Sequence, residues 1–330
     1  MTYLCRKVFV ICAGKVSRIL ENIPNCIDLH QKGLYNMVIK LEKGVFVMAK
    51  VIVTADSTCD LSPQLVQLYD IKILPLWVIV GEKSCRDCVD IFPADIFEYV
   101  SKTHKLPKTA ALSVGEYAEV FRQYKQDGYD IVHISISSYF SSTCQNAVLA
   151  AEEFDNVYVV DSYNLSTGSG HIVLEAAMKA KEGKMSAKEI AEYVNLLVPK
   201  VDASFVVDTL EYLHKGGRCS AVAALGANIL KLRPCIEVKS GKMGVGRKYR
   251  GKMKDVIKLY IEERLTQPRV KYVRNRAFVT HTCVTEGLAD YACELVRQYD
   301  LFDEIIQTTA GCTVSAHCGP DTLGVLFLTE

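Results

Sequence analysis

The sequence lacks three features that would each define a class of protein. No apolar stretch approaches the roughly 20 residues that a membrane-spanning helix needs, so no integral membrane segment is expected. There is no surplus of charge: 39 Lys and Arg stand against 38 Asp and Glu, which gives no reason to expect a nucleic-acid partner. Internal repeats and low-complexity segments are also absent, which argues against a repeat architecture.

Two catalytic signatures are missing as well. The sequence contains no GxSxG, so it has no sign of the nucleophile elbow of an α/β-hydrolase. It contains neither GxxxxGK[ST] nor a glycine-rich dinucleotide fingerprint, which argues against a kinase or a nucleotide-dependent enzyme. If the chain binds a ligand, the residues that do so must be found elsewhere.

The thirteen cysteines follow no regular spacing, and the chain is too long to be a small disulfide-stapled domain. Reduced thiols are the simpler expectation, and with them a cytoplasmic location. The one close pair is Cys85-Arg86-Asp87-Cys88, which has no second CxxC and no nearby His pair to complete a set of four zinc ligands. We therefore expect no metal site.

From residue 51 onward, apolar strands alternate with helices. Such alternation, with strands apolar on both faces, predicts a parallel α/β sheet. Capping boxes at Ser113-Val114-Gly115-Glu116 and Ser186-Ala187-Lys188-Glu189, and a proline after Ser62, predict three helix starts. The predicted strands are 51–54, 71–80, 131–136 and 157–160, and further helices are expected after residues 93, 142 and 166.

The pattern changes near residue 201 to separated strands and short helices, which indicates a smaller α+β domain. Residues 1–50 show only short apolar patches, and Met48 directly precedes the first strong strand. We expect an N-terminal extension of uncertain structure over residues 1–50, an α/β domain over 51–200 and an α+β domain over 201–330. The strands expected in the last are 204–207, 236–238, 277–281 and 323–328, with a helix over 225–233 ended by Pro234.

Hydroxyl side chains follow strand 131–136 where the next helix should begin. Backbone N–H groups at a helix start are unpaired and lie at the positive end of the helix dipole, so hydroxyls beside them suit a carboxylate or a phosphate. The alternative is that Ser141 or Ser142 only caps the helix. Asp56 and Asp161 follow two other parallel strands, so we expect these polar strand ends to meet in one crevice.

The most specific stretch is residues 208–218, in which a glycine pair permits a tight turn that projects Arg218. Together with other segments it resembles the DegV family of bacterial fatty-acid-binding proteins, in order along residues 51–330. The other segments are Asp56-Ser57-Thr58, Leu74-Pro75-Leu76, Pro107-Lys108-Thr109, Ile136-Ser137-Ser138, Ser141, Thr143-Cys144-Gln145, Asp161-Ser162 and Ala316-His317-Cys318-Gly319-Pro320.

This resemblance implies a lipid carrier that has no catalytic residues and no cofactor of its own. Members of the family bind a long-chain fatty acid such as palmitate in a buried tunnel between the two domains. Some of them present its carboxylate to a separate fatty-acid kinase, which forms the acyl phosphate. Tail length and saturation, oligomeric state and the identity of any kinase do not follow from the sequence.

The resemblance also implies roles for individual residues. Thr109 and Ser141 would hydrogen-bond the carboxylate, with Ser138 in the same ligand-binding set. His317 would line the head-group pocket, and Arg218 would organise its charge. Arg250 would dock the kinase, although it lies in a basic run of the kind that is usually only solvated.

Each of these assignments has an alternative. Arg218 could pair with Glu211 for structural reasons, and a lone histidine such as His317 is ordinarily a satisfied structural residue. A serine-dependent hydrolase acting on a lipid or acyl ester is the alternative function, with His317 and Asp56 or Asp161 as partners of a serine. The chain also departs from the family pattern, with Ala110 in place of serine and with Ser142 and Asp321 in place of glycine.

Overall fold

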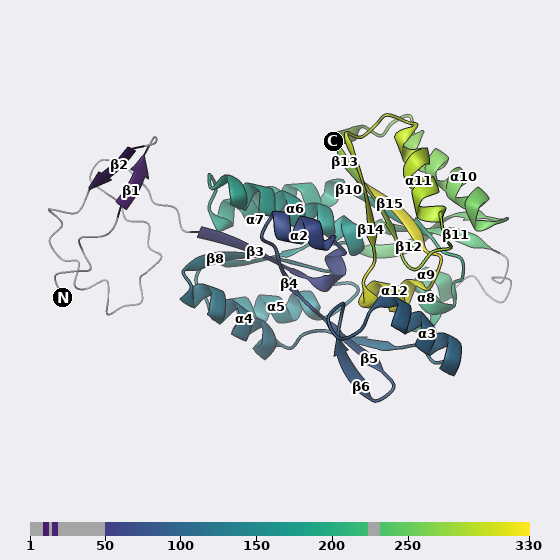
Figure 1. The fold of residues 1–330 in the computed structure, drawn as a ribbon, viewed down its shortest axis with the longest axis horizontal. Coiled ribbons are helices and arrows are strands. Elements are labelled where there is room, and N and C mark those ends of the chain that lie inside the picture. The colour runs from purple at the N-terminus through teal and green to yellow at the C-terminus, as the bar shows by residue number, and fades with distance from the viewer. Residues whose placement is uncertain (1–8, 13–14, 19–49, 224–231) are drawn as a thin grey trace.

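A four-stranded parallel sheet lies at the centre of the first half of the chain (Figure 1). The computed structural model describes residues 9–12, 15–18, 50–223 and 232–330. In the sheet, the strand order is β4 (Lys72–Leu74), β3 (Lys50–Asp56), β8 (Tyr129–Ser135) and β9 (Val157–Asp161). Helices α4 (Val114–Gln126) and α5 (Thr143–Ala151) cover one face, and α2 (Pro63–Leu68), α6 (Ser166–Glu182) and α7 (Ala187–Leu197) cover the other.

The predicted helix starts are confirmed. The Ser113 and Ser186 hydroxyls each accept the N–H group three residues later, at 3.3 Å. The glutamate at that position accepts the N–H of the cap residue in return, at 2.8 Å. Because both unpaired donors are satisfied reciprocally, these helices begin where the sequence indicates. Ser62 likewise accepts the N–H of Leu65, with Pro63 in the first helical turn.

The single strand predicted over residues 71–80 is wrong. It is divided into β4 and β5 (Trp77–Val80), which belong to different sheets. Pro75 has no N–H to donate to a sheet, and Leu76 donates its N–H to the Ser57 hydroxyl. The chain therefore leaves the parallel sheet and forms a small antiparallel sheet, in the order β6 (Lys83–Arg86), β5 and β7 (Lys108–Ala110), with α3 (Pro93–Thr103) inserted before β7.

The second half is built on a six-stranded mixed sheet. All its pairings are antiparallel except β13 with β14. The strand order is β12 (Lys242–Tyr249), β11 (Arg233–Lys239), β10 (Val201–Val206), β15 (Leu323–Thr329), β13 (Tyr272–His281) and β14 (Glu304–Thr309). Its helices are α8 (Glu211–Gly216), α9 (Ser220–Ala223), α10 (Met253–Leu265), α11 (Leu288–Arg297) and α12 (Cys312–Cys318). This arrangement confirms the predicted fold class.

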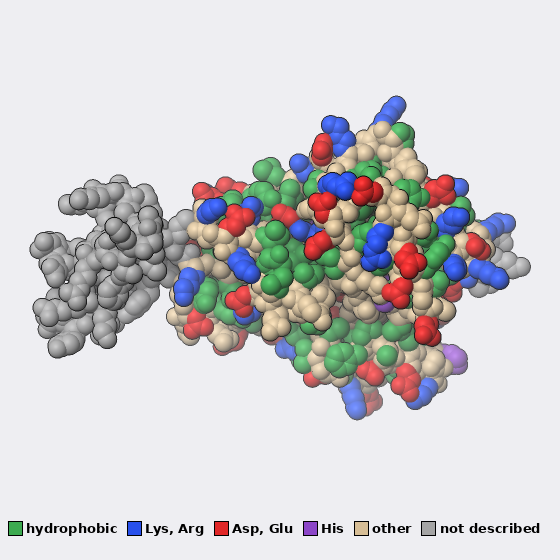
Figure 2. Space-filling model, turned by 45° about the horizontal axis from the view of Figure 1, so that its top comes forward, with side chains coloured by type: hydrophobic (Ala, Val, Ile, Leu, Met, Phe, Trp, Pro, Cys, Tyr) green, Lys and Arg blue, Asp and Glu red, His purple; other side chains and the backbone are tan. Residues whose placement is uncertain are grey.

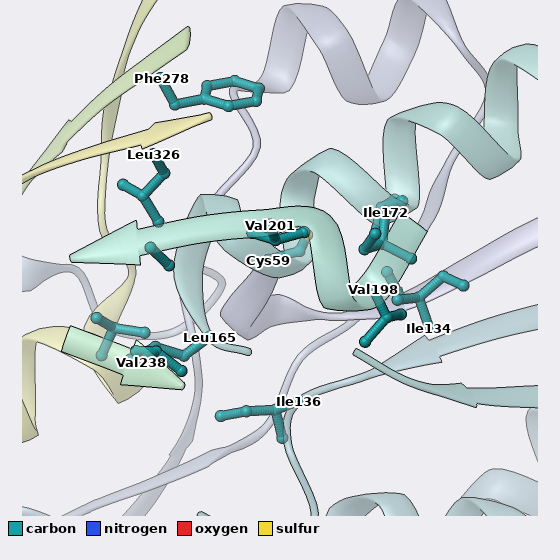
Figure 3. Close-up of a cluster of buried hydrophobic side chains, with 14 of the residues drawn as sticks. Cys59, Ile134, Ile136, Leu165, Ile172, Val198, Val201, Val238, Phe278 and Leu326 are labelled. Atoms are coloured by element: carbon teal, nitrogen blue, oxygen red, sulfur yellow. The ribbon is translucent and has the colours of Figure 1, made fainter. Parts of the chain in front are cut away.

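One hydrophobic core joins the two main sheets through α6. Ile172 of α6 is fully buried in a cluster that contains Ile134 of β8 together with Val201 and Leu326 of the six-stranded sheet (Figure 3). Neighbouring residues of β15 point to opposite faces, so Val325 and Phe327 pack instead in a second cluster with α10 and α11. The domain boundary at residue 200 stays a prediction.

Two short parts of the predicted N-terminal extension and its last residue lie within the described residues. Within residues 1–50, the structure describes a hairpin of β1 (Phe9–Cys12) and β2 (Lys15–Arg18) and the start of β3; the rest of the predicted extension lies outside the described residues. Most of the predicted helix over 225–233 also lies outside them.

None of the described helices is long and apolar enough to cross a bilayer. Positive and negative side chains are interspersed on the visible face (Figure 2).

Candidate functional site

A cavity of 330 Å³ brings together four of the residues singled out in the sequence. These are Thr109 of β7, Ser141 before α5, Arg218 after α8 and His317 of α12. The structure does not place Ser138 or Arg250 with them, since neither lines the cavity and both are exposed. The other lining residues are Leu76, Ala110, Ala111, Ile136, Phe140, Ser142, Leu165, Met243, Thr313, Val314 and Cys318.

Thr109 and His317 are in direct contact across the cavity wall. The Thr109 Oγ1 atom lies 2.8 Å from His317 Nε2, and which of the two donates depends on the imidazole tautomer. The other ring nitrogen, Nδ1, is buried and has no hydrogen-bond partner among the described residues. The hydroxyl of Thr313, which also lines the cavity, is buried and unpartnered in the same way. Two of the residues that line the cavity thus carry a buried polar atom without a partner among the described residues.

The electrostatics of the cavity favour an anion. Burial, and after it the nearby Arg218 guanidinium, lowers the pKa of His317 to about 4. The imidazole is therefore neutral near pH 7, and Arg218 is the only charged residue among the described residues that line the cavity. One cation surrounded by hydroxyls, with no carboxylate in the wall, is an arrangement suited to a carboxylate or phosphate group.

Gly216 provides the space that His317 occupies. A Cβ atom on Gly216 would lie 2.6 Å from His317 Nδ1, which is closer than real atoms approach. The next residue, Gly217, has φ +68° and ends α8 in the left-handed conformation that glycine adopts most easily. The glycine pair therefore has two separate roles, of which the sequence indicated only the turn.

Arg218 is held by backbone carbonyl groups. Its Nη1 donates to the Gly216 carbonyl at 2.6 Å, and its Nε donates to the Phe140 carbonyl at 3.5 Å. The alternative pairing with Glu211 does not form, because Glu211 binds Lys215 at 2.6 Å. The guanidinium charge is thus not neutralised by any carboxylate that the structure describes.

Ser141 agrees with both interpretations of the hydroxyl side chains that follow strand 131–136, as a helix cap and as part of a binding site. Its Oγ accepts the N–H of Thr143 at 3.2 Å and lies 2.5 Å from the Thr143 hydroxyl, so it caps α5 and lines the cavity at once. Ser142 occupies the N-cap position but makes no side-chain cap bond. Its φ of −72° is accessible to any residue, so this position does not require the glycine found in the family pattern.

The polar strand ends converge, but their carboxylates do not reach the cavity. Asp56 is buried and accepts hydrogen bonds from Ser135 Oγ at 2.6 Å and from the Ile136 N–H at 2.9 Å. Asp161 accepts the N–H groups of Tyr163 and Ser138. The expected shared crevice is therefore wrong for these two residues, which fix the backbone around the strand ends instead. Among the strand ends, only the hydroxyl run after β8 contributes polar side chains to the cavity wall.

An apolar hollow continues from the cavity. It has a volume of 30 Å³, and Leu165, Val314 and Cys318 line both spaces. Further along, its wall is formed by residues of the six-stranded sheet, including Phe205 and Leu326. The hollow thus lies between the cavity and the core that joins the two main sheets.

The geometry does not support a serine hydrolase. His317 contacts Thr109 and not Ser141, and none of the described carboxylates binds its Nδ1. Asp56 lies beside a different histidine, His133, at 3.4 Å. A Ser-His-Asp triad requires the base to reach both the serine and the carboxylate, and the described residues do not meet this requirement.

Several residues of the site could not be found from the sequence. Thr313, Val314 and Met243 carry no local signal and reach the cavity only through the tertiary fold.

Asp321, where the family pattern has glycine, has φ 51°. Aspartate tolerates this left-handed conformation better than most residues do, and its carboxylate accepts the Thr285 N–H at 2.7 Å.

The fold and the cavity together define a mixed α/β protein with an anion-favouring cavity. Comparison with known families identifies the family. The family model described as uncharacterised protein, DegV family, matches residues 50–330. The chain therefore belongs to the DegV family, as the sequence motifs predicted.

Three relatives illustrate the family. A curated protein of Thermotoga maritima named fatty acid-binding protein is 30% identical over 282 residues, which cover 83% of this chain and 96% of that protein. A structure described as fatty acid binding of a DegV family protein from Thermus thermophilus has a TM-score of 0.76 at 26% identity, covering 85% of this chain and 100% of the other. A stearic acid-binding protein from Eubacterium ventriosum has a TM-score of 0.72 at 25% identity, covering 86% and 98%.

Proposed function

We propose that this protein binds one long-chain fatty acid, with palmitate as an example, and holds its carboxylate in the 330 Å³ cavity. The observation that carries the proposal is the meeting of Thr109, Ser141 and His317 around a single unpaired cation, Arg218. The fatty-acid-binding names of the relatives support the ligand class.

The tail and the head contribute differently to binding. Burial of apolar surface contributes about 0.8 kcal/mol per CH₂ group, so a tail of roughly 16 carbons contributes on the order of 10 kcal/mol before ordering costs. Hydrogen bonds to a charged head group contribute only about 1.5–3 kcal/mol each. The apolar hollow beyond Leu165 and Val314 is the proposed start of the path for the tail. The polar residues of the cavity wall would fix the orientation of the fatty acid.

We further propose that the protein is a cytoplasmic carrier and not an enzyme, and that a separate fatty-acid kinase phosphorylates the bound carboxylate. Support comes from the described geometry, which offers an anion site but no catalytic triad. Arg250 is proposed to dock the kinase; it is exposed and makes no ion pair among the described residues. No cofactor is proposed.

The proposed function is tested by detecting and identifying the bound lipid. Native mass spectrometry of the purified full chain is expected to show one bound lipid, and solvent extraction is expected to release a long-chain fatty acid. After removal of the lipid, added palmitate is expected to restore the bound mass and raise the melting temperature. A lipid-free protein that is not stabilised by any fatty acid would exclude the proposed function.

A further inference from the structure

Three potential metal ligands meet at the beginning of α12. Asp87 and Cys88 follow β6, while Cys312 is the first residue of α12. One carboxylate oxygen and the two Sγ atoms all lie within 4.8 Å of one another. None of the three residues lines the fatty-acid cavity. The CxxC motif pairs Cys88 with Cys85, but the fold places Cys88 and the adjacent Asp87 beside Cys312, a cysteine from outside the motif.

Both cysteines are hydrogen-bonded to the same backbone carbonyl group. The Cys88 N–H and the Cys312 thiol each donate to the Ile91 carbonyl oxygen, both at 3.1 Å. The Asp87 carboxylate accepts the Cys312 N–H at 2.7 Å. The donor atoms are thus positioned by contacts that do not depend on a ligand.

Gly311 leaves room between the donor atoms. A Cβ atom placed on it would lie 3.1 Å from Asp87 Oδ1 and 3.3 Å from both Cys88 Sγ and Asp60 Oδ1. Oxygen and sulfur atoms from three residues therefore surround the space that a side chain would occupy.

Two buried acidic side chains border this space. Asp60 and Asp87 are both buried, and neither forms an ion pair with a basic residue in the described parts of the chain. Asp60 accepts the Gly311 N–H at 2.8 Å and the Ser166 hydroxyl at 2.6 Å. Burial raises the pKa of Asp60 to about 8, so Asp60 is largely protonated near pH 7. The Asp87 carboxylate has no positively charged partner among the described residues, and this favours a cation beside it.

We propose that Asp87, Cys88 and Cys312 bind a divalent cation of the zinc class, with water in the fourth position. Two thiols and one carboxylate are ligands that Zn²⁺ accepts, and three protein ligands plus a water make an open tetrahedral site. Binding replaces the protons of the two thiols, which pass to solvent. Because Cys88 is exposed, the open position faces water. This proposal does not rest on the proposed lipid function.

The test is titration of the reduced, chelator-stripped full chain with Zn²⁺ alone, in competition with a chromophoric chelator. We expect one equivalent to bind, and Co²⁺ to give the near-ultraviolet absorption of a thiolate complex. Cys88→Ser and Cys312→Ser are each expected to weaken Zn²⁺ binding by at least about tenfold. Cys85→Ser is the matched control from the same hairpin and is expected to bind Zn²⁺ like the wild type.

Two measurements distinguish loss of metal binding from loss of folding. Circular dichroism establishes that each variant is folded, and the Co²⁺ spectrum of the wild type reports thiolate ligation without any substitution. Wild-type Zn²⁺ binding no tighter than that of Cys88→Ser, or equal loss in Cys85→Ser, would overturn the assignment. A Cys88–Cys312 disulfide formed on oxidation by a peroxide, without Zn²⁺ uptake by the reduced chain, would identify a redox pair instead.

Discussion

Thr109 and His317 are 208 residues apart in the sequence, yet their side chains are joined by a 2.8 Å contact. Thr109 belongs to the small antiparallel sheet and His317 to α12, next to the six-stranded sheet. This contact closes one wall of the cavity, so the proposed head-group site depends on the packing of two elements that no local pattern connects.

Replacing Ser141 with alanine is expected to weaken head-group placement more than lipid retention. The loss of one hydrogen bond to a carboxylate costs about 1.5–3 kcal/mol, while burial of the tail is unchanged. Phosphorylation by the proposed kinase should therefore fall by about tenfold or more, with lipid still present in native mass spectra. Ser138→Ala is the matched control, because Ser138 is exposed outside the cavity; equal loss in both variants would contradict the assigned role of Ser141.

Gly216→Ala is expected to displace the His317 imidazole, since the new Cβ would lie 2.6 Å from Nδ1. Overpacking of this kind costs about 1–3 kcal/mol. We expect a lower melting temperature and weaker fatty-acid binding. Gly244→Ala is the control, because a Cβ there would meet nothing within 4 Å. Unchanged binding in Gly216→Ala would show that the position of the imidazole does not matter to the ligand.

His317 should make the lipid-free protein less stable in acid. Its pKa is about 4 in the folded chain, against 6.5 for an ordinary histidine. Between these values the unfolded state binds more protons, so the free energy of unfolding falls as the pH decreases from about 6.5 to about 4. Urea denaturation at several pH values should show a flatter dependence for His317→Gln, whereas the exposed His214→Gln should follow the wild type.

A bound carboxylate should reverse part of this effect, because a negative charge beside the imidazole raises its pKa. NMR titration of the His317 ring is the direct measurement. We expect its pKa to be higher with palmitate bound than without. An unchanged value would show that the carboxylate lies elsewhere.

Val314→Phe is expected to restrict the path of the tail. Val314 is buried and lines both the cavity and the apolar hollow, so a larger side chain narrows the connection between them. We expect the fatty acids recovered by solvent extraction to shift toward shorter chains. The control is Val120→Phe, at a half-buried position of α4 outside both spaces. An unchanged chain-length distribution would place the tail on another route.

Arg250→Ala is expected to raise the KM of the proposed kinase for the lipid-loaded protein without changing lipid content. Arg250 is exposed and unpaired among the described residues, whereas Arg247 is bound to Glu263 at 3.0 Å. Arg247→Ala therefore serves as the control for loss of one positive charge close to Arg250, because Arg247 lies in β12 and Arg250 directly follows that strand. An equal rise in both variants would point to general electrostatic attraction and not to docking at Arg250.

Local patterns predicted the elements whose causes are local. The capping boxes at Ser113 and Ser186 set their helix starts because every hydrogen bond involved lies within four residues. The single strand predicted over 71–80 is wrong because Pro75 has no N–H to continue the ladder, although most of the segment is apolar. The position of Asp56 at a strand end predicted that it would line a ligand crevice. Its carboxylate instead accepts hydrogen bonds from Ser135 and Ile136.

Contacts between distant segments were beyond such patterns. Thr109, Ser141, Arg218 and His317 were indicated by the family resemblance, and only the fold brings them to one cavity. The meeting of Cys88 with Cys312, and the need for Gly216 to make room for His317, have no counterpart in spacing or periodicity. Both depend on where α12 packs.

Helix α6 is wedged between the parallel sheet and the six-stranded sheet, and its buried side chains belong to a core shared by both. Moving the two halves apart as rigid bodies would expose that core, at about 25 cal/mol for each Å² of apolar surface. Entry and release of the proposed fatty acid should therefore proceed through small local displacements around the cavity, without separation of the two halves.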